Sequence, residues 1–251
     1  RTDTLVCVPD GALRTIPLAA LHDGTQFLIK KYAVATTPGV TLTDPRPLDR
    51  KGIKLLSVGI TEAVQDFPAL PHVSREIETI HRLYGGTSLL NKQFMMSRVE
   101  EELKAHPYSI MHIASHGQFQ SESKDTFLLA YDGKMTMDRL EEYVGMLRFR
   151  EEPLALITLS ACETAAGDDR AALGLAGVAI KAGARSALAS LWFLDDEASS
   201  LLVTEFYQQL HDDSAASKAM ALQRAQIRFL ENPEYNHPAY WAAFLLLNNW
   251  L

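Results

Sequence analysis

From Gly52 onward the sequence alternates between short apolar runs and amphipathic segments, and this alternation constrains the fold more than any other feature. Apolar runs of strand length occupy residues 53–60, 108–116, 154–161 and 186–192. Such runs are apolar on both faces, which is typical of strands buried between two layers. Strands of this kind, separated by helices, predict a mainly parallel sheet covered by helices on both sides.

The segments between these strands carry recognisable helix signals. A helix is predicted from about Ser74 to the glycines at 85 and 86, because apolar residues recur every three or four positions. Ser97 and Glu100 fit a capping box at the start of a second helix. Further helices are predicted at 172–183, 196–211 and 215–231, and residues 127–143 suggest a hairpin followed by a short helix.

The first 51 residues have a different character and are predicted to form a small β-rich lead-in. Asp10-Gly11 and Asp23-Gly24 are turn pairs between short apolar runs, which favours a hairpin or meander. Residues 43–52 combine proline, aspartate and basic residues and are typical of a connector. We therefore divide the chain into a lead-in over 1–51 and a core over 52–251.

Composition excludes several classes of function. The net charge of −7, without a local cluster of lysine or arginine, argues against direct binding to nucleic acid or to anionic membranes. The longest apolar runs are far shorter than the roughly 18 to 20 residues of a membrane-spanning helix, so no membrane span is expected. Two cysteines, Cys7 and Cys162, favour a reducing cytoplasmic setting, although a single bridge between them stays open. Because the sequence begins with Arg1, we expect it to be part of a longer protein.

A histidine and a cysteine follow two of the predicted strands. His116 closes the run 108–116, and Cys162 follows the run 154–161. Ligands gather at the carboxyl ends of strands in open α/β sheets, so both side chains are expected at one edge. A cysteine needs a nearby base to react as a thiolate at neutral pH, and a histidine on a neighbouring strand supplies one. His112 lies about 13 Å deeper in the same strand and is predicted to be structural.

The surroundings of this pair suggest acyl chemistry. Backbone N–H groups of Gly117 and Cys162 are candidates for binding the oxyanion of a tetrahedral intermediate. Zinc is not expected, because the two histidines of H-x-x-x-H at 112–116 are too far apart on a strand. No phosphate loop or G-x-S-x-G motif occurs, and no cofactor is expected. Asp195, Asp196 and Glu197 open a helix, where a capping role and a binding role are equally compatible with the sequence.

Several of these motifs together resemble the CHAT domain, a caspase-like family often found after tetratricopeptide repeats. The resemblance is carried by HIASHG (112–117), LSACETAAGDDRAALGLAGVAIKAGARSALASLW (159–192), the following FLDDEAS, HPAYWAAFLLL (237–247), and VPDGALRTIPLAAL near the amino end. It implies a caspase-like three-layer α/β/α sandwich and a cysteine endopeptidase related to caspases, separase and gingipains. In the family pattern His116 matches the catalytic histidine and Cys162 matches the nucleophile.

The resemblance also implies a preference at the cleavage site. Related proteases place an acidic residue beside the fifth strand to receive an arginine or lysine, and Asp195 or Asp196 is similarly placed. We therefore expect a protein substrate cleaved after a basic P1 residue, with regulation by preceding repeats or an effector protein. The alternative is a binding module in which the same shell scaffolds other proteins and the two reactive residues are idle.

Overall fold

A central sheet of eight strands organises the computed structural model. The structure describes residues 3–39, 43–44, 46–119, 126–148, 150, 153–160, 163–164, 171–192 and 194–251. The strands lie in the order β1 (Asp3–Cys7), β2 (Tyr32–Thr36), β12 (Phe244–Asn248), β11 (Ser186–Ser190), β9 (Leu156–Ser160), β5 (Ile110–Ala114), β3 (Leu55–Gly59) and β4 (Thr87–Leu90).

The strands form two parallel blocks of opposite direction. β11, β9, β5, β3 and β4 pair in parallel, whereas β12 runs antiparallel to β11 and is followed by β2 and β1 in its own direction. The predicted parallel sheet is therefore confirmed for the five strands of the first block. Strand β12, in the middle of the sheet, has no counterpart among the strands predicted from sequence.

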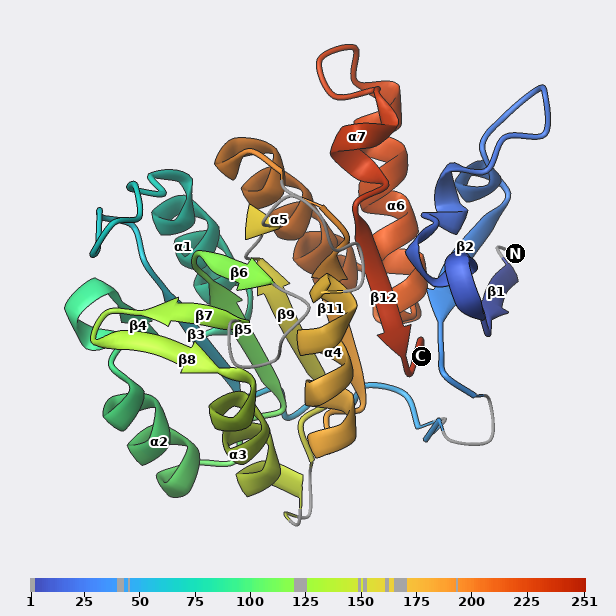
Figure 1. Cartoon of the computed structure of the whole chain (residues 1–251). Helices are drawn as coiled ribbons and strands as arrows, with labels where there is room; N and C mark the ends of the chain where they lie inside the picture. Colours follow the sequence, from blue (N-terminus) through green and yellow to red (C-terminus); the bar gives the residue numbers. More distant parts are fainter. Residues whose placement is uncertain are drawn as a thin grey trace.

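Helices cover both faces of the sheet, which confirms the three-layer α/β/α arrangement (Figure 1). One layer contains α1 (His72–Tyr84), α5 (Asp196–Asp212) and α6 (Lys218–Glu231). The opposite layer contains α2 (Met96–Ala105), α3 (Met137–Arg148) and α4 (Ala171–Ala182), and the short α7 (Pro238–Trp241) precedes β12. Strand β5 shows why both layers form: Met111 and Ile113 enter the core under α2 to α4, and Ile110 enters the other core.

A second, smaller sheet lies at the carboxyl end of β5. It consists of β10 (Glu163–Thr164), β6 (Gly117–Phe119), β7 (Phe127–Ala130) and β8 (Gly133–Thr136), in that order. The hairpin predicted near residue 130 is confirmed as β7 and β8, which pair antiparallel. Because β6 begins directly after His116, this sheet holds the chain on one side of that residue.

The hairpin or meander predicted for the lead-in is wrong. β1 and β2 are parallel and extend the central sheet. The chain between them forms short 3₁₀ turns, η1 (Gly11–Thr15), η2 (Leu18–Ala20) and η3 (Leu28–Lys30). The Asp23-Gly24 turn exists, with the Asp23 carboxylate accepting from Thr25 and Gln26 N–H, but it connects only a single bridge between His22 and Phe27. The turn at Asp23-Gly24 was therefore predicted correctly, whereas the strands with which β1 and β2 pair were not.

The capping box predicted for α2 is also wrong. The helix begins at Met96, its N-cap residue is Met95, and no side chain of the predicted box caps it. Instead the Asp132 carboxylate accepts from the Met96 N–H at 3.0 Å. A carboxylate from the β7–β8 turn thus satisfies a free N–H at the positive end of the helix dipole, a solution that needs tertiary contact.

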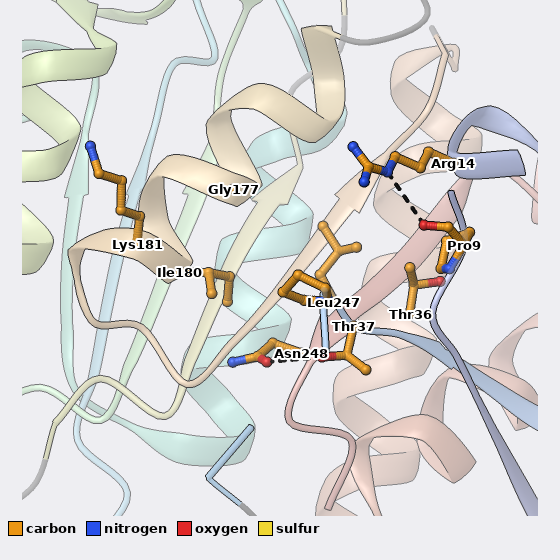
Figure 2. A pocket seen from close by; sticks show the side chains of 10 residues that line it. Pro9, Arg14, Thr36, Thr37, Gly177, Ile180, Lys181, Leu247 and Asn248 are labelled. Carbon is orange, nitrogen blue, oxygen red and sulfur yellow. Dashed lines mark hydrogen bonds between the residues drawn. The ribbon is translucent and has the colours of Figure 1, made fainter. Parts of the chain in front are cut away.

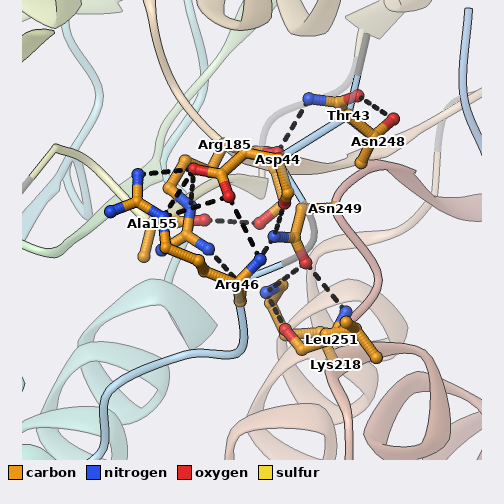
Figure 3. Close-up of polar contacts among 10 residues, drawn as sticks. Thr43, Asp44, Arg46, Ala155, Arg185, Lys218, Asn248, Asn249 and Leu251 are labelled. Carbon is orange, nitrogen blue, oxygen red and sulfur yellow. Dashed lines mark hydrogen bonds and ion pairs between the residues drawn. The ribbon is translucent and has the colours of Figure 1, made fainter. Parts of the chain in front are cut away.

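A polar cluster ties the connector to the carboxyl-terminal residues at the edge of the sheet where β11 begins (Figure 3). The Asp44 carboxylate pairs with Arg46 at 2.5 Å and lies 3.5 Å from Arg185. Asn249 donates to the backbone carbonyls of Asp44 and Arg46, and accepts from Lys218. These contacts fix the connector against the start of α6 and the end of β12.

Lys218 in this cluster predicts an unusual pH dependence of stability. It is 1% exposed, and burial, followed by the nearby charges of Arg185 and Arg50, lowers the pKa of its ammonium group from 10.5 to about 7. Between these two values the unfolded chain binds more protons than the folded chain, so stability rises with pH. We expect the free energy of unfolding to gain about 2 kcal/mol from this group between pH 7 and pH 9.

The measurement is urea denaturation of the wild type and of Lys218→Met at both pH values. The variant should lack this gain, and Lys104→Met, on the exposed face of α2, should keep it. Equal pH profiles for the wild type and Lys218→Met would contradict the prediction.

Within the part of the chain that the structure describes, every helix is too short or too polar to cross a bilayer.

Candidate active site

His116 is buried at the junction of the two sheets. It follows the end of β5 by two residues, immediately before β6, and is 8% exposed. Its backbone is held from the side, because the Leu129 N–H of β7 donates to the His116 carbonyl at 2.8 Å. The neighbouring Ser115 hydroxyl donates to the Leu129 carbonyl. Both bonds fix the direction in which the imidazole leaves the strand.

The loop between β3 and α1 orients the imidazole. The His116 Nε2 lies 2.8 Å from the carbonyl oxygen of Pro68, and the Phe67 ring packs 5.1 Å from the imidazole. Reciprocal backbone bonds between Val64 and Phe67 close this loop tightly, and Gln65 adopts a left-handed φ of 54°. A left-handed conformation costs a residue with a side chain about 1 kcal/mol or more, so tertiary contacts maintain the loop.

The contact with Pro68 determines the tautomer of His116. A backbone carbonyl only accepts, so the Nε2 atom must carry the proton. In the neutral ring Nδ1 then has a free lone pair, and no described residue hydrogen-bonds to it. The geometry therefore leaves Nδ1 as the ring atom that can accept a proton.

The Gly117 N–H is not engaged by the strand β7. The bond from Leu129 to His116 flanks the Gly117–Leu128 pair, which makes that pair a non-hydrogen-bonded pair of the antiparallel ladder. The Gly117 N–H is consequently directed away from β7, toward the side on which β10 pairs with β6. This direction is compatible with the oxyanion role predicted for Gly117.

Cys162 lies outside the described residues, as does Ala161, and the nearest described residues are Ser160 before it and Glu163 after it. Before it, Ser160 at the end of β9 pairs with Ala114 at the end of β5. After it, Glu163 in β10 pairs with Gln118 in β6. The chain therefore pairs with the segment that carries His116 both before and after position 162.

Asp195 and Asp196 both bind backbone N–H groups. Asp195 is exposed and caps α5, accepting from the Ala198 N–H at 3.0 Å. Asp196 is half-buried and accepts from the His72 N–H at the start of α1, at 2.8 Å. Burial is the main cause that raises the pKa of the Asp196 carboxyl group. Each carboxylate thus has a structural role, and within the described part of the chain only one oxygen of each side chain accepts a hydrogen bond.

The first turn of α5 lies close to the end of β9. The Ser199 hydroxyl is 3.3 Å from the Ser160 hydroxyl, two residues before Cys162. Asp195 and Asp196 therefore belong to a helix end that contacts the strand leading to the predicted nucleophile.

His112 has the structural position that its depth in the strand suggested. It is fully buried, its Nε2 lies 2.8 Å from the Glu76 Oε1 of α1 without hydrogen-bond alignment, and the Tyr207 ring packs 5.6 Å away. Cys7 is a free, half-buried thiol, so it forms no bridge to Cys162, which the sequence had left open. Burial raises the pKa of the Cys7 thiol. Among the described residues, no group of three or more His, Cys, Asp or Glu is arranged to hold a metal ion.

The most important site feature that the sequence did not reveal is the Pro68 carbonyl. Every residue has a backbone carbonyl oxygen, so residue type does not indicate which one binds a histidine. Pro68 is also 48 residues from His116 in the sequence. The Phe67-Pro68 pair, in the loop that follows the predicted strand at 53–60, was a weak signal for it.

Comparisons with known proteins agree with this arrangement. The family model described as "CHAT domain" matches residues 1–249. Among curated proteins, none matches the chain. One similar solved structure is the complex of the pro- and mature domains of RgpB from Porphyromonas gingivalis, with a TM-score of 0.52 and 10% identity, covering 78% of this chain and 47% of that one.

Another similar structure is the Arg-specific cysteine proteinase gingipain R, with a TM-score of 0.55 and 8% identity, covering 88% of this chain and 55% of that one. The chain thus spans about half the length of the structures it matches. This likeness supports the caspase-like fold that the sequence resemblance implied. Since the family model matches nearly the whole length, the chain belongs to the CHAT domain family.

Proposed function

We propose that the chain is a cysteine endopeptidase in which Cys162 is the nucleophile and His116 is the base. The observation that carries the proposal is the orientation of His116 by the Pro68 carbonyl, which leaves Nδ1 available at the carboxyl end of the sheet. Pairing of Ser160 with Ala114 and of Glu163 with Gln118 supports the proposal that Cys162, between them, acts together with His116. The proposal places Cys162, directly before Glu163, beside the segment that follows His116, because consecutive Cα atoms are only 3.8 Å apart.

The proposed reaction is an acyl transfer. Nδ1 of His116 takes the proton from the Cys162 thiol, and the thiolate attacks the scissile carbonyl. The oxyanion is bound by the N–H groups of Gly117 and Cys162. The imidazolium then gives its proton to the leaving amine, and water, deprotonated by the imidazole, hydrolyses the thioester. Burial of His116 and its bond to Pro68 reduce the reorganisation that each proton transfer requires.

We further propose that the P1 residue is basic and that Asp195 or Asp196 binds it. A guanidinium or ammonium group entering a pocket needs a carboxylate to offset its desolvation. The contact between Ser199 and Ser160 supports a location of both carboxylates close to the strand that precedes Cys162. A cytoplasmic location, and restraint by repeats or an effector protein, stay predictions.

The experiment compares fluorogenic peptides with arginine, lysine, citrulline or norleucine at P1. We expect the basic peptides to be cleaved at least 10-fold faster than citrulline or norleucine, and Cys162→Ala to cleave none of them. Asp195→Asn and Asp196→Asn separate the two candidates, because asparagine keeps the helix cap and removes the charge. The variant of the residue that binds P1 should lose most of the preference for arginine over citrulline.

Glu197→Gln is the matched control, since Glu197 is an exposed acid in the same helix turn. Unchanged preference in both aspartate variants would exclude them as P1 ligands. Absence of cleavage of any peptide by the wild type, together with equal reactivity of Cys162 with and without His116, would favour the scaffold instead.

A further inference from the structure

A groove separates α4 from the lead-in, on the face of the sheet that α2, α3 and α4 cover (Figure 2). Its volume is about 480 Å³, within the range of roughly 300 to 1,000 Å³ that is usual for ligand sites. The floor is Leu247 of β12 and the end of β2, and one wall is formed by Gly177 and Ile180 of α4. The function proposed above makes no use of it.

Two features of the fold keep this groove open. The strands β12 and β2 meet at a single pair, Leu247 with Thr36, and Leu247 at this pair lines the groove. The wall helix has a glycine, Gly177, where a Cβ atom would meet nothing within 4 Å. A glycine inside a helix costs about 0.5 to 1 kcal/mol relative to alanine, and neither a close contact nor its backbone conformation requires it here.

The groove is apolar and bordered by positive charge. Among the described residues, the apolar side chains of Leu247, Ile180 and two prolines line it beside two cations and no acidic residue, although the whole chain carries a net charge of −7. Arg14 reaches over the groove from the lead-in, held by the Pro9 carbonyl at 3.3 Å and by the exposed Asp10 at 3.2 Å. A carboxylate of a ligand can replace Asp10 as the partner of Arg14, or bind Arg14 beside it, at little cost in free energy, because the Arg14–Asp10 pair is exposed to solvent.

The apolar surface continues beyond the groove along the lead-in. Five large hydrophobic side chains are exposed among the described residues, and four of them belong to residues 8–21: Val8, Leu13, Ile16 and Leu21. Two of these are direct neighbours of groove residues, Val8 of Pro9 and Leu13 of Arg14. A small molecule in the groove would leave them exposed, whereas a polypeptide segment can cover both.

The geometry points to a docking site for a peptide segment of a partner protein that carries aliphatic side chains and at least one carboxylate. The aliphatic side chains fill the groove over Leu247 and Ile180, and the carboxylate pairs with Arg14. The groove lies at the edge of the sheet where β11 begins, whereas His116 lies at the opposite edge, so docking leaves the candidate active site open. The docking does not depend on peptidase activity.

The test is selection of 12-residue peptides from a random display library on the wild-type protein, followed by titration of the enriched peptides. We expect the enriched peptides to combine leucine, isoleucine or valine with aspartate or glutamate. Gly177→Leu fills the groove and should weaken their binding at least 10-fold. Arg14→Glu should weaken it by about 10-fold and should favour basic peptides in a repeated selection.

Gly145→Leu on α3 is the matched control, because a Cβ atom there also meets nothing within 4 Å and Gly145 does not line the groove. It should bind the peptides within twofold of the wild type. Thermal unfolding of both leucine variants checks that neither is destabilised. The proposal would be overturned if the enriched peptides bound Gly177→Leu as tightly as the wild type, or if the selection enriched basic peptides. It would also be overturned if the groove bound the fatty acid dodecanoate but no peptide.

Discussion

Replacing His116 with alanine is expected to lower kcat/KM for peptide cleavage by about 10²- to 10⁴-fold, the usual contribution of a positioned general base. The imidazole is buried and its Nε2 proton is directed at the Pro68 carbonyl, so Nδ1 alone is available to accept the thiol proton. Removing the ring leaves the Cys162 thiol to ionise with the pKa of an ordinary cysteine, about 8.5.

The measurement that isolates this step is the rate of alkylation of Cys162 by iodoacetamide between pH 5 and pH 10, beside peptide hydrolysis. The wild type should react at pH 6 to 7, and His116→Ala should react only as the pH approaches 8.5. His106→Ala, at the exposed end of α2, is the control and should behave as the wild type. Identical alkylation profiles for the wild type and His116→Ala would mean that the two side chains do not interact.

Breaking the pair between His112 and Glu76 is expected to destabilise the protein by about 3 to 5 kcal/mol, because it leaves one buried polar group without its partner. Both side chains are almost completely buried and their nearest atoms are 2.8 Å apart. The pair joins the centre of β5 to α1, the helix that follows the loop orienting His116. At about 2 to 4 °C per kcal/mol, His112→Leu should lower Tm by roughly 6 to 20 °C.

The double variant His112→Leu, Glu76→Leu separates loss of the pair from loss of packing. Replacing both members by apolar residues of similar volume removes the unpartnered group, so the double variant should recover most of the stability lost in His112→Leu. Glu142→Gln breaks an exposed pair with Arg139 and should change stability by less than about 1 kcal/mol. Additive losses in the double variant would show that the contact itself contributes nothing.

Local patterns were sufficient for most helices and for the core strands. The predicted helices correspond to α1, α4, α5 and α6 within a few residues, because apolar periodicity and terminal glycines are recorded in adjacent residues. The same holds for β3, β5, β9 and β11, whose side chains are buried on both faces. The ends of elements were predicted less accurately. Helix α2 begins at Met96, whose N–H is bound by Asp132, and no residue near Met96 in the sequence indicates this cap.

Strand β12 was not predicted, for a different reason. Its apolar run, 240–247, carries no signal that distinguishes a buried strand from a buried helix, and its partners β11 and β2 are about 60 and 210 residues away. The parallel pairing of β1 with β2 was misassigned as a hairpin because turn residues specify a reversal only where the flanking strands pair with each other.

The sequence by itself determined most helices, the core strands of the parallel block, and the position of His116 and Cys162 at the ends of two of those strands, since these properties depend on near neighbours along the chain. Only the tertiary structure decided that β5 and β9 are adjacent, that the Pro68 carbonyl selects the tautomer of His116, and that Asp195 and Asp196 cap two different helices. Strand order and backbone contacts are decided by hydrogen bonds between groups that every residue possesses, so residue identity does not encode them locally.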